Sequence, residues 1–423
     1  MLLYRGSQSR RPGAVVVMVA VCLTLLMAIL AISLDGGSLL AERRHAQATA
    51  DAAALAAASD LYEKYWTNSG LDLNGTAVAS ALRTAADNGY SNDGSVSRVT
   101  VHVPPQTGRY AGLRGYAEVI VEYNQGRAFS NIFGRNPLRV RARAVALGAP
   151  IAADVGILVL DPSVKSALNS QGSGGTNVNG TPVVVNSSHT EAAIAGGGGA
   201  LQADEFLIRG GYTTTGGGSF VGPIRTGRPG MEDPLADIPP PDPTTMVIQS
   251  RKKVQFTSGT QTLSPGVYKG GISVSGTGSL ILEPGIYYMD GGGFSFSGQG
   301  SLVGHGVMIY NAPGNGQADG ISVTGQGSMI LSPPTDGIYH GLTFFQDRTS
   351  NVQGNVEGTG GTTDITGTFY FSGAHLKVSG NGGVVNLGSQ YISNTLYLGG
   401  NGTINIQWSP DKVARKRSIY LVE

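Results

Sequence analysis

Three patterns of hydrophobic and polar positions follow one another along the chain. Residues 14–34 ("AVVVMVAVCLTLLMAILAISL") form a run of 21 residues without a charge. As a helix this run would measure about 31 Å, enough to cross the hydrocarbon core of a bilayer. Residues 42–66 are rich in alanine and contain neither proline nor glycine, so the helix is expected to continue beyond the bilayer. After it, apolar residues recur at alternate positions in short segments, which is typical of β-strands.

The apolar run favours a retained membrane anchor. The alternative is a cleaved signal peptide, whose apolar core is usually about 7–15 residues long and therefore shorter than this run. Arg5, Arg10 and Arg11 precede the run, and the positive-inside rule then favours a cytoplasmic N-terminus. We expect a single-pass membrane protein with most of its chain outside the cytoplasm. The single cysteine, Cys22, falls within the run and forms no internal disulfide.

A small α/β segment follows the long helix. Residues 74–90 have a helical pattern, and residues 99–103, 117–123 and 138–144 alternate as three strands. A long helix packed on a small antiparallel sheet is a pilin-like arrangement; the alternative for the alanine-rich helix is a plain stalk. Alternation places Arg139, Arg141 and Arg143 on the face opposite the apolar residues. This basic stripe is either a solvated sheet face or a contact for lipid headgroups or an acidic partner.

The glycine-rich remainder reads as a repeat. Corners made of Ser, Thr or Gly followed by Gly recur with steps of 22, 27, 55 and 20 residues, at Gly276, Gly298, Gly325, Gly380 and Gly400. Two alternating apolar residues precede each corner and a second short apolar run follows it. Periods of 20–50 residues are typical of solenoids, in which stacked coils share one interior. The pattern therefore predicts a parallel β-helix, with a sandwich or barrel as the alternative.

These patterns give a mainly β protein with an N-terminal transmembrane helix. The expected order is a cytoplasmic tail (1–13), a transmembrane helix (14–34), an alanine-rich extension (35–66), a pilin-like α/β segment (67–150), the start of the solenoid (151–223), a proline-rich loop (224–245), the solenoid repeats (246–408) and a basic C-terminal tail (409–423).

Composition narrows the classes of function. Charged residues are 13% of the chain, hydrophobic residues are 40% and the formal net charge is +1. Disorder normally combines low hydrophobicity with high net charge, so a globally disordered chain is excluded. A nucleic-acid binder would carry a basic excess, so nucleic acid is excluded as a partner.

The N-terminal 50 residues resemble a known family. The segment from Arg10 to Ala58 is similar to the N-terminus of TadE/TadG-like Flp pilus-assembly proteins, in which a glycine precedes the span, an Asp follows it and an alanine-rich run closes the extension. The residues that fit this pattern are Gly13, Asp35, Gln47, Ala50, Asp51, Ala52, Ala53, Ala54, Leu55 and Ala56. Related pilin-like members carry Glu where this chain has Met18, which argues against processing as a pilin. The resemblance implies pilus-assembly proteins as partners and a place in the bacterial inner (cytoplasmic) membrane.

A second motif of this family does not carry over. In TadG-like proteins an apolar strand ending in Asp-x-Ser-x-Ser opens a metal-binding von Willebrand factor A domain. Here Asp161 and Ser163 match, but Lys165 stands at the last position. Hard cations need oxygen ligands, and an ammonium group repels them. We therefore expect no metal site.

Candidate catalytic residues are sparse. Some β-helix proteins cleave polysaccharides, which requires clustered carboxylates or carboxylates that hold a cation. The best cluster is Asp336, His340, Asp347 and Arg348, with Asp319 as a further member. The competing interpretation is that these residues satisfy turns and form a surface ion pair. We expect no catalysis and no cofactor.

The sequence thus predicts a membrane-anchored structural protein related to Flp/Tad pilus assembly, which displays a β-helix for surface contacts or adhesion. The alternatives are a membrane-tethered polysaccharide lyase or hydrolase and a glycan-binding adhesin. The expected partners are the lipid bilayer, pilus-assembly proteins and surface glycans.

Overall fold

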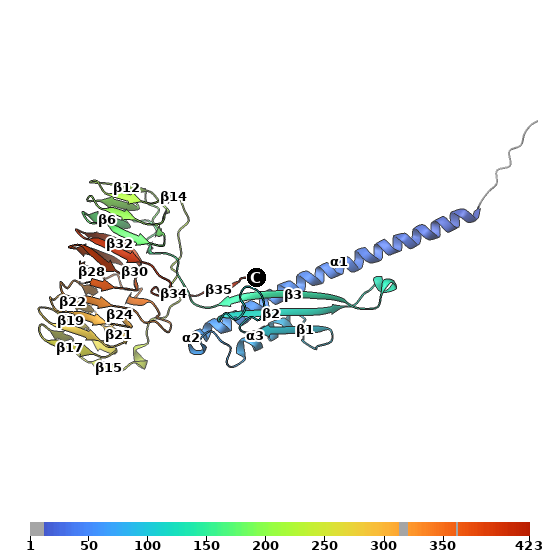
Figure 1. Ribbon diagram of the computed structural model, residues 1–423, viewed down its shortest axis with the longest axis horizontal. Helices are drawn as coiled ribbons and strands as arrows, with labels where there is room; N and C mark the ends of the chain where they lie inside the picture. The colour runs from blue at the N-terminus through green and yellow to red at the C-terminus, as the bar shows by residue number, and fades with distance from the viewer. Residues whose placement is uncertain (1–11, 313–319, 361–362) are drawn as a thin grey trace, which may run out of the picture. The chain divides into compact units, whose positions relative to one another are not determined.

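The computed structural model describes residues 12–312, 320–360 and 363–423, and the chain divides into two compact units (Figure 1). The first unit contains the chain through Pro150 together with Ser418–Glu423, and the second is Ile151–Arg417. The chain therefore enters the second unit once and returns from it once. Of the predicted tail 1–13, only Pro12 and Gly13 are described, and they begin the first helix.

The long helix of the first unit is α1 (Pro12–Glu63), whose 52 residues span about 78 Å. Among the described residues, α1 is the helix long and apolar enough to cross a membrane. Its apolar side chains from Val15 to Leu34 are mostly exposed, whereas the alanines of its second half are buried. Two shorter helices follow, α2 (Tyr65–Asn68) and α3 (Thr76–Asp87). The predicted long helix is confirmed.

A four-stranded antiparallel sheet, counted over the described residues, packs against α1. Its order is β1-β2-β3-β35, with the bounds Ser97–His102, Tyr116–Gln125, Leu138–Gly148 and Ile419–Leu421. The 3-10 helix η1 (Ser130–Phe133) lies in the connection between β2 and β3. The C-terminal tail differs from the sequence prediction, because residues 146–148 pair with residues 419–421. The second unit is therefore an insertion between β3 and β35.

The second unit is a parallel β-solenoid of about 11 turns over the described residues, as the glycine-rich repeat predicts. Each full turn has three faces. The first face contains β5 (Ile157–Val159), β8 (Val183–Val185), β11 (Phe206–Ile208), β14 (Ile224–Thr226), β15 (Ile248–Ser250), β18 (Gly266–Lys269), β21 (Gly285–Asp290), β24 (Val307–Ala312), β27 (Leu342–Gln346) and the first parts of β30 (Thr368–Asn381) and β32 (Gln390–Gly400).

The other two faces complete each turn. The second face contains β6 (Leu168–Gly172), β9 (Ala193–Gly196), β12 (Tyr212–Thr214), β16 (Val254–Phe256), β19 (Ile272–Val274), β22 (Phe294–Phe296), β25 (Ile321–Val323), β28 (Gly354–Thr359) and the second parts of β30 and β32. The third face contains β7 (Thr176–Asn179), β10 (Ala200–Gln202), β13 (Ser219–Val221), β17 (Thr260–Leu263), β20 (Ser279–Leu282), β23 (Leu302–Gly304), β26 (Met329–Leu331), β29 (Thr363–Ile365), β31 (Val384–Leu387) and β33 (Thr403–Gln407).

The order of the turns in space is not their order in the chain. On the third face the strands run β13-β10-β7-β33-β31-β29-β26-β23-β20-β17. The first turn therefore lies in the middle of the stack, beside the last turn, and Figure 1 shows green strands next to red ones at this point. The chain builds outward from the middle to one end, crosses to the other end, and returns to the middle.

Residues 227–247, here called the strap, make this crossing. They connect β14, at one end of the stack, with β15, at the other. Ten strand spacings amount to about 48 Å, and 21 residues can span about 70 Å when extended. The strap contains the 3-10 helix η2 (Pro243–Thr245). Proline suits it, because a ring nitrogen without a hydrogen cannot pair with a neighbouring sheet.

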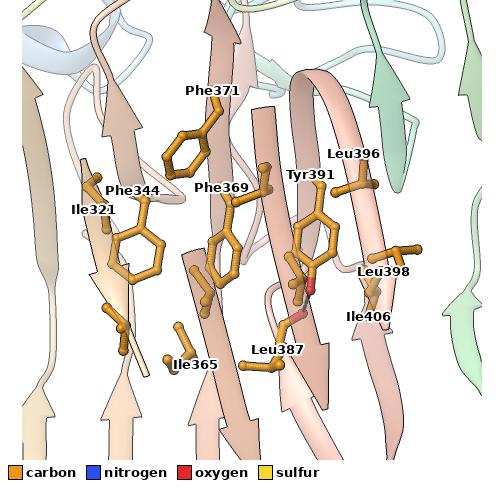
Figure 2. Packing of buried hydrophobic residues seen from close by; sticks show 14 of the residues in the cluster. Ile321, Phe344, Ile365, Phe369, Phe371, Leu387, Tyr391, Leu396, Leu398 and Ile406 are labelled. Carbon is orange, nitrogen blue, oxygen red and sulfur yellow. Dashed lines mark hydrogen bonds between the residues drawn. The ribbon is translucent and has the colours of Figure 1, made fainter. Parts of the chain in front are cut away.

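The interior of the solenoid is one continuous apolar cluster. Phe344, Phe369 and Tyr391 come from three consecutive turns, and their ring centroids are 4.8 and 5.1 Å apart. Figure 2 shows these rings side by side along the stack, with aliphatic residues around them. The Tyr391 hydroxyl donates a hydrogen bond to the Leu387 carbonyl, so its burial leaves no polar group unsatisfied. Each such ring contributes roughly 1.5–3 kcal/mol through burial.

Candidate functional site

The alanine-rich part of α1 is an interface with the unit's own sheet. The buried alanines recur at the spacing of one helix face and are fully covered, at Ala46, Ala50, Ala53, Ala54, Ala57 and Ala58. The sheet approaches so closely at Gly148 that a Cβ there would lie 1.8 Å from the Ala58 carbonyl oxygen. Small side chains on both elements therefore allow the close packing, and the plain-stalk alternative is wrong.

Two polar residues of the family pattern fix the helix on the sheet. The Gln47 side-chain amide donates to the Arg143 carbonyl of β3 at 3.0 Å and to the Asp51 carboxylate at 2.8 Å. Gln47 and Asp51 lie one helical turn apart, so the carboxylate holds the amide in place. Both residues therefore have a structural role in this unit.

Asp35 joins α1 to the connection between β2 and β3. Its carboxylate is buried and accepts hydrogen bonds from the Ser130 backbone N–H at 2.7 Å, the Ser130 hydroxyl at 2.5 Å and the Phe129 N–H at 3.2 Å. The hydrogen bonds from Ser130 lower the pKa of Asp35 below its ordinary value. Asp35 directly follows the apolar run, so this contact lies where the apolar part of α1 ends.

A buried carboxylate lies on the other face of the sheet. The Glu118 side chain is fully buried and contacts His102 at 3.0 Å, Arg143 at 2.6 Å and the Thr107 hydroxyl. Burial alone would raise the pKa of Glu118, but hydrogen bonds from Thr107 and Arg143, with others, outweigh it and lower the pKa to about 2. Arg143 also pairs with Glu423, which ties the C-terminal strand to the sheet.

Arg348 binds the strap, and Asp347 next to it binds a neighbouring turn. The Arg348 guanidinium donates to the carbonyls of Leu235 and Ile238 at 2.6 and 2.9 Å, and to the Tyr370 hydroxyl at 2.7 Å. Tyr370 in turn donates to Asp233 of the strap at 2.6 Å. Leu235 and Ile238 are buried in an apolar cluster on the outer side of the first face. That face is therefore covered on both sides.

The Asp347 carboxylate accepts hydrogen bonds from the Tyr310 hydroxyl at 2.5 Å and from the backbone and hydroxyl of Thr349 at 2.8 and 2.5 Å. Burial opposes its ionisation, but the bonds from Thr349 and Tyr310 outweigh burial and lower the pKa of Asp347. Burial, together with the bond to Asp347, raises the pKa of the Tyr310 hydroxyl. The carboxylate is thus a stable anion that holds a turn and a neighbouring tyrosine.

His340 and Asp336 lie in the turn before β27 and have different environments. His340 is buried, its Nδ1 lies 2.7 Å from the Thr335 carbonyl, and burial lowers its pKa. Asp336 is exposed. His340 thus bonds to a carbonyl of its own turn, whereas Asp347 bonds to Tyr310 and Thr349. Asp319, the further candidate, lies outside the described residues.

The Asp161 motif forms a turn. Its carboxylate accepts the backbone N–H groups of Ser163 and Val164 at 2.9 and 2.8 Å, while Lys165 pairs with Glu191. Within the described ranges, no three His, Cys, Asp or Glu side chains are placed to hold a metal ion.

Sequence reasoning missed Glu118 and the strap residues that Arg348 and Tyr370 bind. In the strand "YAEVIVEYNQ", Glu118 stands between apolar residues, and an acid at such a position indicates a buried partner. In the strap, the corresponding signal is a pair of apolar residues, Leu235 and Ile238, in a run of prolines and acids. An apolar pair in such a polar segment indicates docking.

Residues 13–60 match the model of the Tad family, Flp pilus-assembly TadE/G-like. The matched segment lies within α1 and contains all the residues of the family pattern. No curated protein matches the chain, and no solved structure matches it. The match and the apolar helix together indicate a membrane-anchored protein with a relation to Flp pilus assembly.

Proposed function

We propose that the protein is a non-catalytic structural component of a Flp/Tad-type pilus system, held in the cytoplasmic membrane by α1 with both units outside the cytoplasm. The observation that carries the proposal is the set of hydrogen bonds that Asp35, Gln47 and Asp51 form. These family-pattern residues join α1 to a compact helix–sheet unit. The solenoid, inserted into that unit's sheet, then offers a long outer surface for contacts with other proteins or surface glycans.

The pilus role is tested in cells. Deleting the gene should reduce the number of surface filaments counted by electron microscopy, and the full chain should restore them. A chain with Gly148→Ala should fail to restore them, whereas Gly126→Ala, where an added Cβ meets open space, should succeed. Unchanged filament numbers after deletion would remove the pilus role.

Orientation is tested separately. Three arginines precede the apolar run, which supports a cytoplasmic N-terminus. In spheroplasts, added trypsin should digest the second unit while a tag at the N-terminus stays protected. Digestion of the tag instead would reverse the proposed orientation.

The enzymatic alternative makes a different prediction. Arg348 binds the strap and Asp347 binds a tyrosine of the neighbouring turn, which favours a structural role for both. The purified full chain should therefore release no products from a panel of acidic polysaccharides. Product release that disappears in Asp347→Asn would support the lyase or hydrolase instead.

A further inference from the structure

The connection between β2 and β3 is fixed next to the apolar run of α1. The backbone N–H groups of Phe129 and Ser130 donate to the Asp35 carboxylate. Asp35 directly follows Leu34, the last residue of the run. The tip of the β2–β3 hairpin, residues 126–137, therefore lies at the level where α1 emerges from a bilayer.

The remaining contacts show that the sheet extends away from this level. Gln125, at the end of β2, donates to the Ser38 hydroxyl at 3.1 Å. Further along, Gln47 bonds the Arg143 carbonyl, and Gly148 packs against Ala58. Because α1 rises 1.5 Å per residue, these contacts lie progressively farther from the apolar run. The hairpin tip is the end of the sheet nearest the membrane.

The tip has the chemistry of an interfacial anchor. Its sequence, "GRAFSNIFGRNP", contains Arg127 and Arg135 and no acid, and Arg139 follows it at the start of β3. The Phe129 side chain is 55% exposed, and the side chains of Arg135 and Arg139 are exposed as well. Within the part of the chain that the structure describes, these two arginines form no ion pair. The carboxylate that faces the tip, Asp35, is buried and occupied by N–H donors.

The rest of the basic stripe is less suited to an anionic partner. Arg98 and Arg141 flank Glu122 in the strand register, and the Arg141 Nε lies 3.9 Å from the Glu122 carboxylate. One acid is thus shared by two arginines, which reduces the positive field there. The uncompensated charge is concentrated toward the hairpin tip.

We propose that the hairpin tip binds the anionic surface of the bilayer that α1 crosses. Phe129 enters the headgroup region, and Arg135 and Arg139 contact lipid phosphates. Aromatic side chains flanked by arginines are typical of interfacial anchors, and anionic lipids attract cations within a Debye length of about 8–10 Å. The contact would hold α1 and the first unit at a fixed height above the membrane. The proposal rests on membrane anchorage and is independent of the pilus role.

The test uses the full chain in vesicles. In a Cys22→Ser background, the exposed Ala128 is changed to Cys and labelled with an environment-sensitive fluorophore, which leaves Phe129 in place. Leu113→Cys is the matched control, because Leu113 is 47% exposed and precedes β2 at the opposite end of the sheet. Quenching by headgroup-nitroxide lipid is compared between phosphatidylcholine vesicles and vesicles that also contain phosphatidylglycerol.

The expected result is strong quenching at position 128 in phosphatidylglycerol vesicles, weaker quenching in phosphatidylcholine, and weak quenching at position 113 in both. Arg135→Gln and Arg139→Gln should each lower the docking equilibrium about fivefold. Equal quenching at positions 128 and 113 would show that the tip does not reach the headgroups. Equal quenching at position 128 in both vesicles would show that anionic lipid is not recognised. Either outcome overturns the proposal and leaves the cellular tests of pilus function unaffected.

Discussion

Asn177, in the first turn of the solenoid, and Asn405, in the last, lie opposite each other in paired strands, and their side-chain amides are hydrogen-bonded at 3.0 Å. Two arms of the chain that grow in opposite directions therefore meet in the middle of one stack. The entry strand β4 (Ile151–Ala152) and the exit strand β34 (Arg415–Lys416) also pair with each other. A domain whose ends lie together can be inserted into another unit without disrupting it.

This arrangement explains how a solenoid comes to lie between two strands of one small sheet. A solenoid stacked in chain order would have its ends about ten strand spacings apart, roughly 48 Å. β3 and β35 are neighbours and cannot be separated by that distance. Because the solenoid begins and ends in the middle of the stack, its two ends lie close enough to join β3 and β35. This arrangement requires a segment that crosses from one end of the stack to the other, and the strap is that segment.

Removing the strap's main contact should destabilise the solenoid. Arg348→Ala leaves the carbonyls of Leu235 and Ile238 without their donor, and hydrogen bonds to charged groups are worth about 1.5–3 kcal/mol. We expect the unfolding free energy of the second unit to fall by about 2 kcal/mol, measured by thermal unfolding. Trypsin should also cleave faster after Arg228, at the start of the strap. Arg251→Ala, which removes an exposed arginine, should change neither; an equal effect of both variants would show that the contact is unimportant.

Adding one methyl group at Gly148 should disrupt the helix–sheet packing. A Cβ there would overlap the Ala58 carbonyl, and the backbones must separate to accept it. We expect Gly148→Ala to destabilise the first unit by about 3 kcal/mol, seen as faster amide hydrogen exchange in β2 and β3. Gly126→Ala is the control, and protection that is unchanged in Gly148→Ala would contradict the close approach.

Stability of the first unit should depend on pH through Glu118. Its pKa is lowered from 4.5 to about 2 on folding, so the folded state holds the ionised form more strongly than the unfolded chain does. The resulting stabilisation, about 3 kcal/mol, is fully present above pH 4.5 and is lost as the pH falls toward 2. The protection factors of the β2 amides, which compare their exchange with that of the unfolded chain at the same pH, should therefore fall from pH 4.5 toward pH 2.

Glu118→Gln should remove that acid dependence and lower stability at neutral pH, because Arg143 and His102 lose their charged partner. Glu122→Gln on the same strand, whose side chain is 47% exposed, should retain the wild-type pH profile. Identical acid profiles for Glu118→Gln and the wild type would contradict the assignment.

Much of the solenoid could be predicted from the apolar pattern alone. The apolar residues two positions before the aligned glycine corners occupy one column of the second face, and Val356 fills the double step of 55 residues. The full column is Val274, Phe296, Val323, Val356, Val378 and Leu398. Inward-facing positions are specified locally, because every strand must alternate to bury one side.

The order of the turns could not be predicted in the same way. Parallel strands pair through backbone groups, which are the same in every turn. The sequence of a turn therefore does not specify which other turn will stack on it. The strap contact shows the same limit: Arg348 lies 113 residues from Leu235 in the chain. Asp347 and Arg348 form a charged pair in a charge-poor region, which suggested a catalytic site. The sequence does not show the distant residues that this pair binds.

The meeting of the first and last turns is the central claim, and a disulfide tests it most directly. In a Cys22→Ser background, Asn177→Cys and Asn405→Cys should cross-link on mild oxidation, since paired strands lie about 4.8 Å apart and disulfides need a Cα separation below about 7 Å. Asn386 pairs with Asn405 on its other side, so the Asn177→Cys/Asn386→Cys variant, two strands apart, should remain reduced. The account predicts a cross-link in the first variant alone, detected by mass spectrometry. A chain stacked in sequence order would give no cross-link between positions 177 and 405, and that result would contradict it.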